Sequence, residues 1–479
     1  MTEHRPTSHR SGPRQASVGR RSLAVLPLRN AGADPAQEYL ADGITESLIR
    51  QLSATPWLRV LARASVFRLK GRDAEPQTVR RELGVEAMLS GELRVRGEHI
   101  ELAVELVDCA AGTRLWEARY ELGVAELPRI EAEITRGVGR SLPGEPADEA
   151  ADAPALSPRV DARAYRLYLR GRYLWNQRSE ASLDRARAFF EQALTLDSGY
   201  ALAWSGIADT WNVQPFWGIR PPLEAFPRAQ EAVRRALELD PELPEAHAAL
   251  GYSRFFFDWD WPAAARSFGR ALELAPNLAV AHHRLGVALA LIGDADDAVD
   301  AMDRALQLDP LSLIIQADLG LVDLLGGRPK RAEAHCRAAL ELAPDFAPAH
   351  YYLGLTLERL GRPDEAVDSF LRAEGLAGGA GWALAAAGYA WAASGRTAEA
   401  RRVLQRLEAF RDTYYVPEYA VAVVHVGLGD LEAALDWLER GIAQRCERMV
   451  WLPQDPRMAP LADDPRFAQV RAALPQTSS

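Results

Sequence analysis

Four histidines are the side chains in this sequence best suited to bind a metal ion or to transfer protons: His247, His282, His283 and His350. Three of them keep a regular spacing, because His282 follows His247 by 35 residues and His350 follows His282 by 68. These steps are one and two lengths of the repeat described below, so the three side chains lie side by side in successive units. The spacing favours a role in packing, and we predict no metal site and no cofactor.

Motifs of common catalytic sites are missing. The sequence contains no GxSxG nucleophile turn, no phosphate-binding GxxxxGK[ST], no HExxH and no GxGxxG. The acidic pairs at 296–297 and 463–464 are expected in turns or at helix starts, where carboxylates interact favourably with the helix dipole. We therefore predict that the chain is not an enzyme and has no catalytic residues.

A repeat of about 34 residues positions the histidines. The sequence Ala-Leu-x-Leu-x-Pro occurs four times, and its prolines are separated by 35, 34 and 34 residues. A glycine, an alanine and then a bulkier residue follow each proline at fixed places. Small residues suit the contact of two antiparallel helices, and the proline ends the second helix. These columns are Pro241, Pro276, Pro310 and Pro344; Gly251, Gly286, Gly320 and Gly354; Ala264, Ala298, Ala332 and Ala366; and Phe268, Met302, Cys336 and Phe370.

Weaker copies extend the array in both directions, which gives about eight helix pairs over residues 162–445. The period and the pattern resemble the tetratricopeptide repeat, and this part of the chain is identified as a member of that family. The resemblance implies a superhelix with a concave groove for protein partners. The tail from Trp451 to Phe467 resembles the terminal segment of such arrays, and we expect it to cover the apolar face of the last repeat.

A different pattern precedes the repeats. Short apolar or alternating segments predict strands at 22–28, 58–61, 87–95 and 100–107, and a further strand through Leu115 and Tyr120. Periodic segments predict helices at 37–54, 79–83 and 127–138. These elements indicate one small α/β sheet domain. The predicted fold class is therefore an α/β sheet domain followed by an all-α superhelix.

Residues 22–140 resemble the TolB amino-terminal-like domain. The matching stretches include Ala24–Asn30, Ala41–Glu46, Val60–Ser65 and 108–116, in the same order as in the family. In that family the domain usually follows a cyclase, a kinase or a DNA-binding winged helix in bacterial signalling proteins. The resemblance implies a regulatory role in signal transduction.

The chain divides near residues 142–160, where four prolines and four acidic residues stand without a basic residue up to Pro158. We predict a disordered basic tail at 1–21, a TolB-like domain at 22–141, an acidic proline-rich linker at 142–160, the repeat array at 161–448, and a capping segment and tail at 449–479. The apolar run after Arg20-Arg21 is too short for an export signal. No apolar run reaches the roughly 20 residues of a membrane span, and we expect a cytoplasmic protein.

The resemblance to tetratricopeptide arrays also selects residues for a partner-binding groove. By spacing, the groove positions of the family fall on Tyr252, Phe255, His283, Val287, Leu321, Tyr351 and Leu355. They are mostly apolar and include no lysine or asparagine, so the groove is suited to an apolar peptide segment and not to a terminal carboxylate. In a second interpretation, the aromatic residues between 204 and 261 fill the core of enlarged second and third repeats.

The charge balance bears on the partner. The chain has 56 basic and 66 acidic residues and a net charge of −10. Residues 161–479 hold 34 of the basic and 43 of the acidic residues, a net charge of −9. An acidic array favours a basic and apolar partner and argues against nucleic acid.

Together these features predict a non-enzymatic protein-binding scaffold or adaptor that regulates bacterial signal transduction. The alternative is a regulatory half that senses a small ligand and acts on a separately encoded cyclase or kinase.

Overall fold

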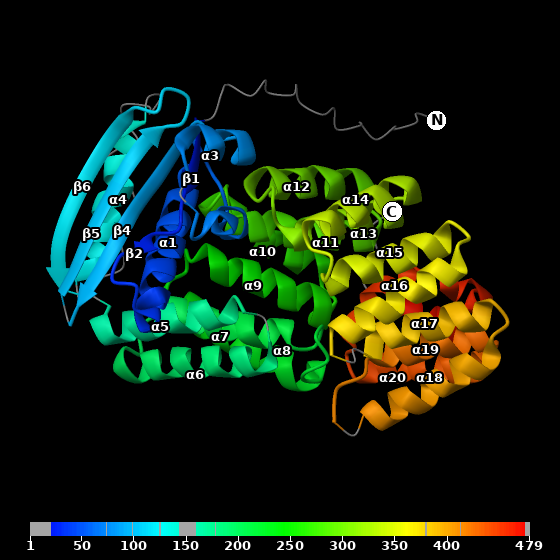
Figure 1. Cartoon of the computed structure of the whole chain (residues 1–479). Coiled ribbons are helices and arrows are strands. Elements are labelled where there is room, and N and C mark those ends of the chain that lie inside the picture. Colours follow the sequence, from blue (N-terminus) through cyan, green and yellow to red (C-terminus); the bar gives the residue numbers. More distant parts are fainter. Residues whose placement is uncertain are drawn as a thin grey trace, which may run out of the picture.

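The protein consists of a sheet domain and a ring of helices that pack against each other (Figure 1). The computed structural model describes residues 21–474 apart from residues 73, 98, 124–125, 143–159, 178, 379–380 and 412. Residues 1–20 of the predicted basic tail and almost the whole predicted linker therefore lie outside the described residues, and Arg21, predicted to belong to the tail, begins the first strand. The prediction of an α/β sheet domain followed by an all-α superhelix is confirmed.

The sheet domain has six strands in the order β3-β1-β4-β5-β6, and the short β2 pairs with β4. β1 is parallel to β3 and β4, whereas β4, β5 and β6 form an antiparallel meander. The two-residue β2 was not predicted, because it is too short to show a pattern. The elements are β1 (Arg21–Val25), β2 (Arg29–Asn30), α1 (Glu38–Ser53), β3 (Leu58–Val60), α2 (Arg63–Val66), α3 (Pro76–Leu83), β4 (Ala87–Arg96), β5 (His99–Asp108), β6 (Arg114–Gly123) and α4 (Leu127–Ser141).

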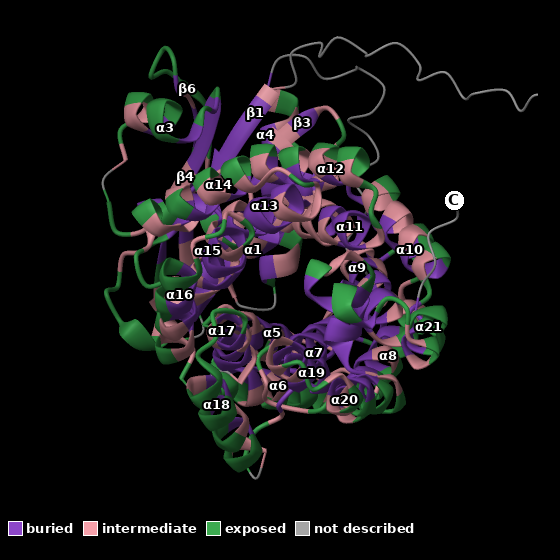
Figure 2. Ribbon diagram, turned by 90° about the vertical axis from the view of Figure 1, so that its right-hand side faces the viewer, coloured by how far each residue is buried: buried purple, intermediate pink, exposed green. Residues whose placement is uncertain are grey.

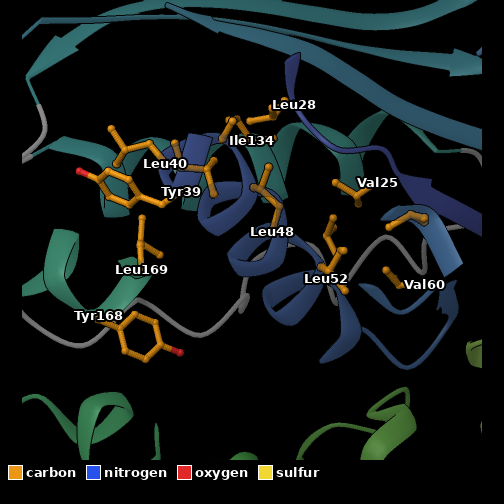
Figure 3. Close-up of a cluster of buried hydrophobic side chains, with 14 of the residues drawn as sticks. Val25, Leu28, Tyr39, Leu40, Leu48, Leu52, Val60, Ile134, Tyr168 and Leu169 are labelled. Carbon is orange, nitrogen blue, oxygen red and sulfur yellow. The ribbon is translucent and has the colours of Figure 1, made fainter. Parts of the chain in front are cut away.

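One apolar core joins the sheet domain to the first repeat. Leu40, Leu48 and other buried residues at helical spacing turn one face of α1 toward β1 and α4. The same cluster continues into Tyr168 and Leu169 of α5, as Figure 3 shows. At this contact a Cβ on Gly43 would lie 2.8 Å from the Leu169 side chain, so only glycine lets α1 and α5 approach this closely. The two parts therefore share one core.

Sixteen helices, α5 to α20, follow in the described residues and form the predicted eight antiparallel pairs. Figure 2 shows that the first helices of the pairs lie on the inner side of the ring and that most of the second helices lie on the outer side. The pairs are α5 (Ala162–Trp175) and α6 (Glu180–Leu196), α7 (Ala201–Val213) and α8 (Pro222–Leu239), α9 (Pro244–Ser253) and α10 (Trp261–Leu274), α11 (Ala279–Ile292) and α12 (Ala295–Leu308), α13 (Leu313–Leu325) and α14 (Pro329–Leu342), α15 (Ala347–Arg359) and α16 (Pro363–Leu376), α17 (Gly381–Ala393) and α18 (Thr397–Phe410), and α19 (Glu418–Leu428) and α20 (Leu431–Ala443).

The conserved spacing of the repeats within this chain has the predicted steric cause. Each glycine of the first helix faces the bulky residue of the second helix in the same pair. A Cβ on Gly251, Gly286, Gly320 or Gly354 would lie only 2.4 to 2.7 Å from that residue. The facing residues are Phe268, Met302, Cys336 and Phe370, each at most 1% exposed.

The array closes on itself after one turn. The loop before α8 meets the loop before α19, where the Tyr415 amide donates a hydrogen bond of 3.0 Å to the Gly218 carbonyl. The second repeat therefore contacts the last one, and the helices surround a common interior (Figure 2).

The sheet domain makes a second contact with the ring, at the turns between repeats three, four and five. The Asn277 side chain donates hydrogen bonds of 2.9 and 2.7 Å to the carbonyls of Thr55 and Leu58. At the next turn between repeats, the Ala62 amide donates a hydrogen bond of 2.7 Å to the Leu308 carbonyl. The sheet domain is thus held at both α5 and the middle repeats.

Candidate protein-binding groove

The structure places the predicted groove residues on or next to the first helices of repeats three to six. Tyr252 lies on α9, Phe255 on the following π-helical stretch η4 (Arg254–Asp258), and Leu321 on α13. His283 and Val287 come from α11, and Tyr351 and Leu355 from α15. Six of the seven belong to or pack against one apolar cluster; His283 instead pairs with Asp318, with 2.6 Å between Nε2 and Oδ2.

Burial divides this set. Phe255 is fully buried, and Leu321, Tyr351 and Leu355 are at most 7% exposed. Tyr252, His283 and Val287 are half-buried. Only these three offer part of their surface to a partner in this conformation, and the role of the set as a binding site stays a prediction.

The cover over these residues is a part of the chain itself. After α20, Arg445 adopts a left-handed conformation (φ 53°), and the chain continues as η5 (Glu447–Gln454) and η6 (Pro456–Leu461). We call Glu447–Leu461 the C-terminal segment. Its Met449 and Trp451 belong to the same apolar cluster as the predicted groove residues. The chain then forms α21 (Pro465–Ala472), which packs on α20. The role of residues 449–479 as a capping segment stays a prediction.

Buried carboxyl groups mark the contact between the C-terminal segment and the ring. Burial raises the pKa of Glu447 to about 7, although Arg448 and the Tyr415 hydroxyl act in the opposite direction. Burial likewise raises the pKa of Glu358 on α15 to about 7. Asp455 differs, because Arg457 overcomes its burial and lowers its pKa. Two carboxyl groups at this contact therefore titrate near neutral pH.

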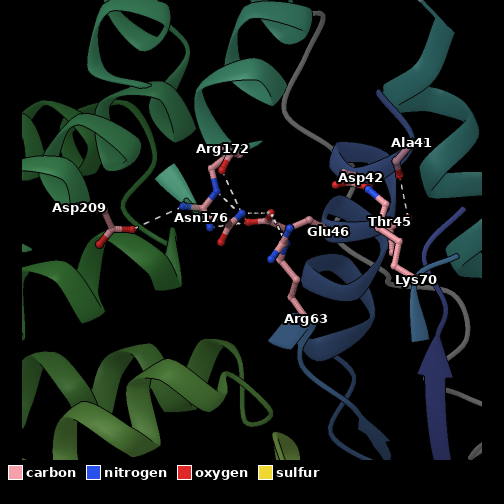
Figure 4. Close-up of polar contacts among 9 residues, drawn as sticks. All are labelled: Ala41, Asp42, Thr45, Glu46, Arg63, Lys70, Arg172, Asn176 and Asp209. Carbon is pink, nitrogen blue, oxygen red and sulfur yellow. Dashed lines mark hydrogen bonds and ion pairs between the residues drawn. The ribbon is translucent and has the colours of Figure 1, made fainter. Parts of the chain in front are cut away.

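A charged chain runs from the sheet domain into the ring (Figure 4). Glu46 on α1 accepts hydrogen bonds from Arg172 Nε at 2.8 Å and from Asn176 at 3.0 Å. Arg172 also lies 3.6 Å from Asp209 on α7, which accepts a hydrogen bond of 3.2 Å from Arg284 on α11. The Arg284 guanidinium stacks over the Tyr252 ring at 4.9 Å. The chain thus connects α1 to a predicted groove residue.

The electrostatics of this chain stabilise the ionised form of Glu46. Burial alone would raise the pKa of Glu46, but Arg172 and Arg63 lower it below its usual value. These contacts were not predicted from the sequence. The residues involved stand far apart along the chain, and no local spacing brings them together.

A separate open groove lies between the second helices of the first two repeats. It has a volume of about 560 Å³, and α7 forms its floor. The Arg187 and Arg228 guanidinium groups lie 4.8 and 4.7 Å from the centre of the Trp211 ring. Its lining residues include Leu194, Trp204, Ile207, Trp211, Pro227 and Arg228.

The repeat histidines have a local structural role. His247, His282 and His350 each place Nε2 2.8 to 3.0 Å from the carbonyl of the proline six residues earlier. Burial lowers the pKa of His282. Within the described residues, no group of three or more histidine, cysteine, aspartate or glutamate side chains is arranged to hold a metal ion. Among the same residues, no helix combines the length and the apolar character that a bilayer span requires.

Family models match both parts of the chain. Two tetratricopeptide repeat models match residues 260–312 and 318–381, and residues 381–406 and 419–440. Residues 19–132 match the second domain of HilA/YgeH-like transcriptional regulators. The more specific resemblance to the TolB domain stays a prediction.

Individual relatives cover parts of the chain. A Rhizobium meliloti (strain 1021) protein named "Putative adenylate cyclase 3" is 32% identical over 232 residues, which are 48% of this chain and 39% of that protein. MamA is 29% identical over 32% of this chain and 88% of its own, with a TM-score of 0.27. PilF of Pseudomonas aeruginosa is 18% identical over 48% of this chain and 98% of its own, with a TM-score of 0.33.

The matches and the fold agree on the architecture. Tetratricopeptide repeats form protein-interaction scaffolds, and the eight helix pairs of the ring have this construction. The chain therefore carries tetratricopeptide repeats and, packed against them, a domain similar to the second domain of HilA/YgeH-like transcriptional regulators.

Proposed function

We propose that this protein is a non-enzymatic, cytoplasmic scaffold that binds a partner protein and thereby regulates bacterial signal transduction. The observation that carries the proposal is the tetratricopeptide array, which shares a core with a domain matched by a regulator model. A repeat scaffold presents one continuous inner face to a partner, and the regulatory domain contacts that scaffold directly.

The surface chemistry favours a basic and apolar partner segment. Residues 161–479 carry 43 acidic against 34 basic residues, which supports a cationic partner and disfavours nucleic acid. In the proposed groove, the half-buried Tyr252, His283 and Val287 are the residues that a partner can reach in this conformation.

A second function is favoured by the relative named as an adenylate cyclase. In this alternative the protein is a regulatory half that senses a small ligand and controls a separately encoded cyclase or kinase. The alternative predicts that a metabolite raises the melting temperature of the purified chain in the absence of any partner.

Affinity capture with crosslinking in the native cell tests the scaffold, followed by binding measurements with the purified partner. We expect Tyr252→Ala to weaken binding by at least about tenfold. Tyr414→Ala is the matched control, because Tyr414 is 50% exposed in the loop that follows α18. Full binding by Tyr252→Ala would reject the groove assignment. If no partner protein is captured and a metabolite strongly raises the melting temperature, the alternative is favoured.

A further inference from the structure

The C-terminal segment crosses the interior of the ring and does not stay beside the last repeat. Arg448 donates to the Phe216 carbonyl at 3.5 Å, and Arg445, just before the segment, donates to the Phe257 carbonyl at 3.5 Å. On the opposite side, the Trp451 ring lies 6.5 Å from the Tyr351 ring and 6.4 Å from the Tyr352 ring, measured between centroids. The chain here therefore contacts repeats two and three on one side and repeat six on the other.

The later part of the segment uses polar contacts with the last two repeats. The Arg457 guanidinium lies 5.4 Å from the centre of the Tyr389 ring on α17. Asp455 accepts a hydrogen bond from the Tyr419 hydroxyl on α19 and one of 2.9 Å from Arg457 Nε. An aromatic side chain and an arginine six residues later thus meet matching groups on the first helices.

Some buried polar atoms beneath the segment lack a hydrogen bond. Glu447 Oε1 and Arg448 Nε are buried 3.5 Å apart without a hydrogen bond, and buried Oε2 of Glu358 also has none. A small cavity of about 10 Å³ remains between Tyr351, Trp382 and the segment. Incompletely paired buried charges weaken an interaction relative to a fully paired contact.

The shape of the segment also differs from that of a repeat. It consists of two 3₁₀ stretches with Pro453, Pro456 and Pro460, and it pairs with no antiparallel helix of its own. An irregular, proline-containing segment that lies against several first helices has the form of a bound peptide.

We propose that the inner face of the ring is a binding channel for an extended partner segment with a bulky aromatic residue and a following arginine, and that Glu447–Leu461 occupies this channel in the free chain. The proposal rests on the proposed scaffold function. The partner segment displaces the C-terminal segment, so Trp451 and Arg457 show the chemistry that the channel recognises. The surplus of acidic residues in the array favours a partner segment that is more basic than the resident one.

Exchange of the segment tests this proposal. A protease recognition sequence is inserted between Ala443 and Gln444, which are both exposed, and the purified full chain is then cut there. A fluorescent peptide of residues 447–461 is added, and its anisotropy is measured with the cut and the uncut chain. We expect the cut chain to bind at least about tenfold more tightly, and a peptide with Trp451→Ala to lose that binding.

The control is a peptide of residues 465–474, which represents the predicted cap on α20 and carries the equally buried Phe467. We expect it not to bind the channel. A cut chain that keeps its circular dichroism spectrum but binds no labelled 447–461 peptide would overturn the proposal. Capture of a partner by the same chain would leave the scaffold function intact, so the two failures can be told apart.

Hydrogen exchange on the unmodified chain gives a second test that needs no insertion. We expect amides of residues 447–461 to exchange faster than those of α15 and α19, which the segment contacts. Equal protection of the segment and these two helices would show a permanent part of the core and would reject the proposal.

Discussion

Glu46 and Glu447 lie at two places where another part of the chain meets the ring, and their surroundings differ. Glu46 is surrounded by Arg172, Arg63 and Asn176, and the two arginines together with the hydrogen bond from Asn176 outweigh its burial and lower its pKa. Glu447 is fully buried beside Arg448 at 3.5 Å and accepts a hydrogen bond from the Tyr415 hydroxyl, but burial outweighs these contacts and raises its pKa to about 7. The sheet domain is therefore held by paired charges, and the C-terminal segment carries a carboxyl group that resists ionisation.

The two attachments also differ in the contacts that surround these carboxyl groups. Besides the charged chain, the sheet domain shares an apolar core with the first repeat, and its backbone carbonyls accept hydrogen bonds from the Asn277 side chain. The C-terminal segment relies on aromatic contacts. Both attachments contain buried polar atoms without a hydrogen bond, Arg63 Nε at the first and Glu447 Oε1 and Arg448 Nε at the second. We expect the first contact to be permanent and the second to open.

Glu46→Gln should have the largest effect on stability. Removing this charge leaves Arg172 and Arg63 largely buried near one another, which costs about 3 kcal/mol of unfolding free energy. Urea unfolding followed by circular dichroism measures the loss. The control is Glu117→Gln in the exposed pair with Arg114, where we expect a change below about 0.5 kcal/mol. Equal losses in the two variants would contradict the special role of the charged chain.

Leu308→Ala tests the second contact between the sheet domain and the ring. Leu308 is fully buried where Ala62 binds its carbonyl, whereas Leu342 at the same repeat position is 39% exposed. We expect a loss of about 3 kcal/mol for Leu308→Ala. Leu342→Ala is the matched control and should change stability by less than about 1 kcal/mol. Similar losses would show that the repeat itself, and not the docked domain, buries Leu308.

Glu447→Gln tests the other side of the comparison through pH. The folded pKa of about 7 lies above the usual 4.5, so the folded chain holds a proton that the unfolded chain releases between these values. This contribution is fully present below pH 4.5 and is lost as the pH rises through 7. We expect the variant to match the natural chain at pH 5 and to exceed its stability at pH 8 by on the order of 2 to 3 kcal/mol.

The intact chain should follow the same direction, because burial also raises the pKa of Glu131 and Glu358 to about 7 and that of Asp309 to about 6. The urea concentration at its unfolding midpoint should therefore decrease as the pH is raised from 5 to 8. The exposed Glu408→Gln is the control and should leave that pH dependence unchanged. A natural chain whose stability rises over this range would reject the assignment of Glu447 as a buried, protonated group.

Local pattern predicted the repeats well, because each pair of helices is fixed by contacts within about 34 residues. The contacts of Gly251 with Phe268 and of Gly354 with Phe370 follow directly from that spacing. The covered state of Tyr351 could not be predicted in this way, because Trp451 reaches it only after the array has closed. The charged chain through Glu46, Arg172 and Asp209 likewise depends on how distant elements dock.

Substitution of a repeat histidine should have the smallest effect on stability. These histidines lie in neither of the two contacts compared above. His350→Ala removes the contact of Nε2 with the Pro344 carbonyl, which lies at 2.8 Å near the surface. Because water can replace an exposed hydrogen bond, we expect a loss of only about 0.5 to 1 kcal/mol. The same loss is expected with and without added zinc, since successive histidines bind their own prolines and do not converge. A rise of the melting temperature with zinc in the natural chain that disappears in His350→Ala would overturn the packing role of this position.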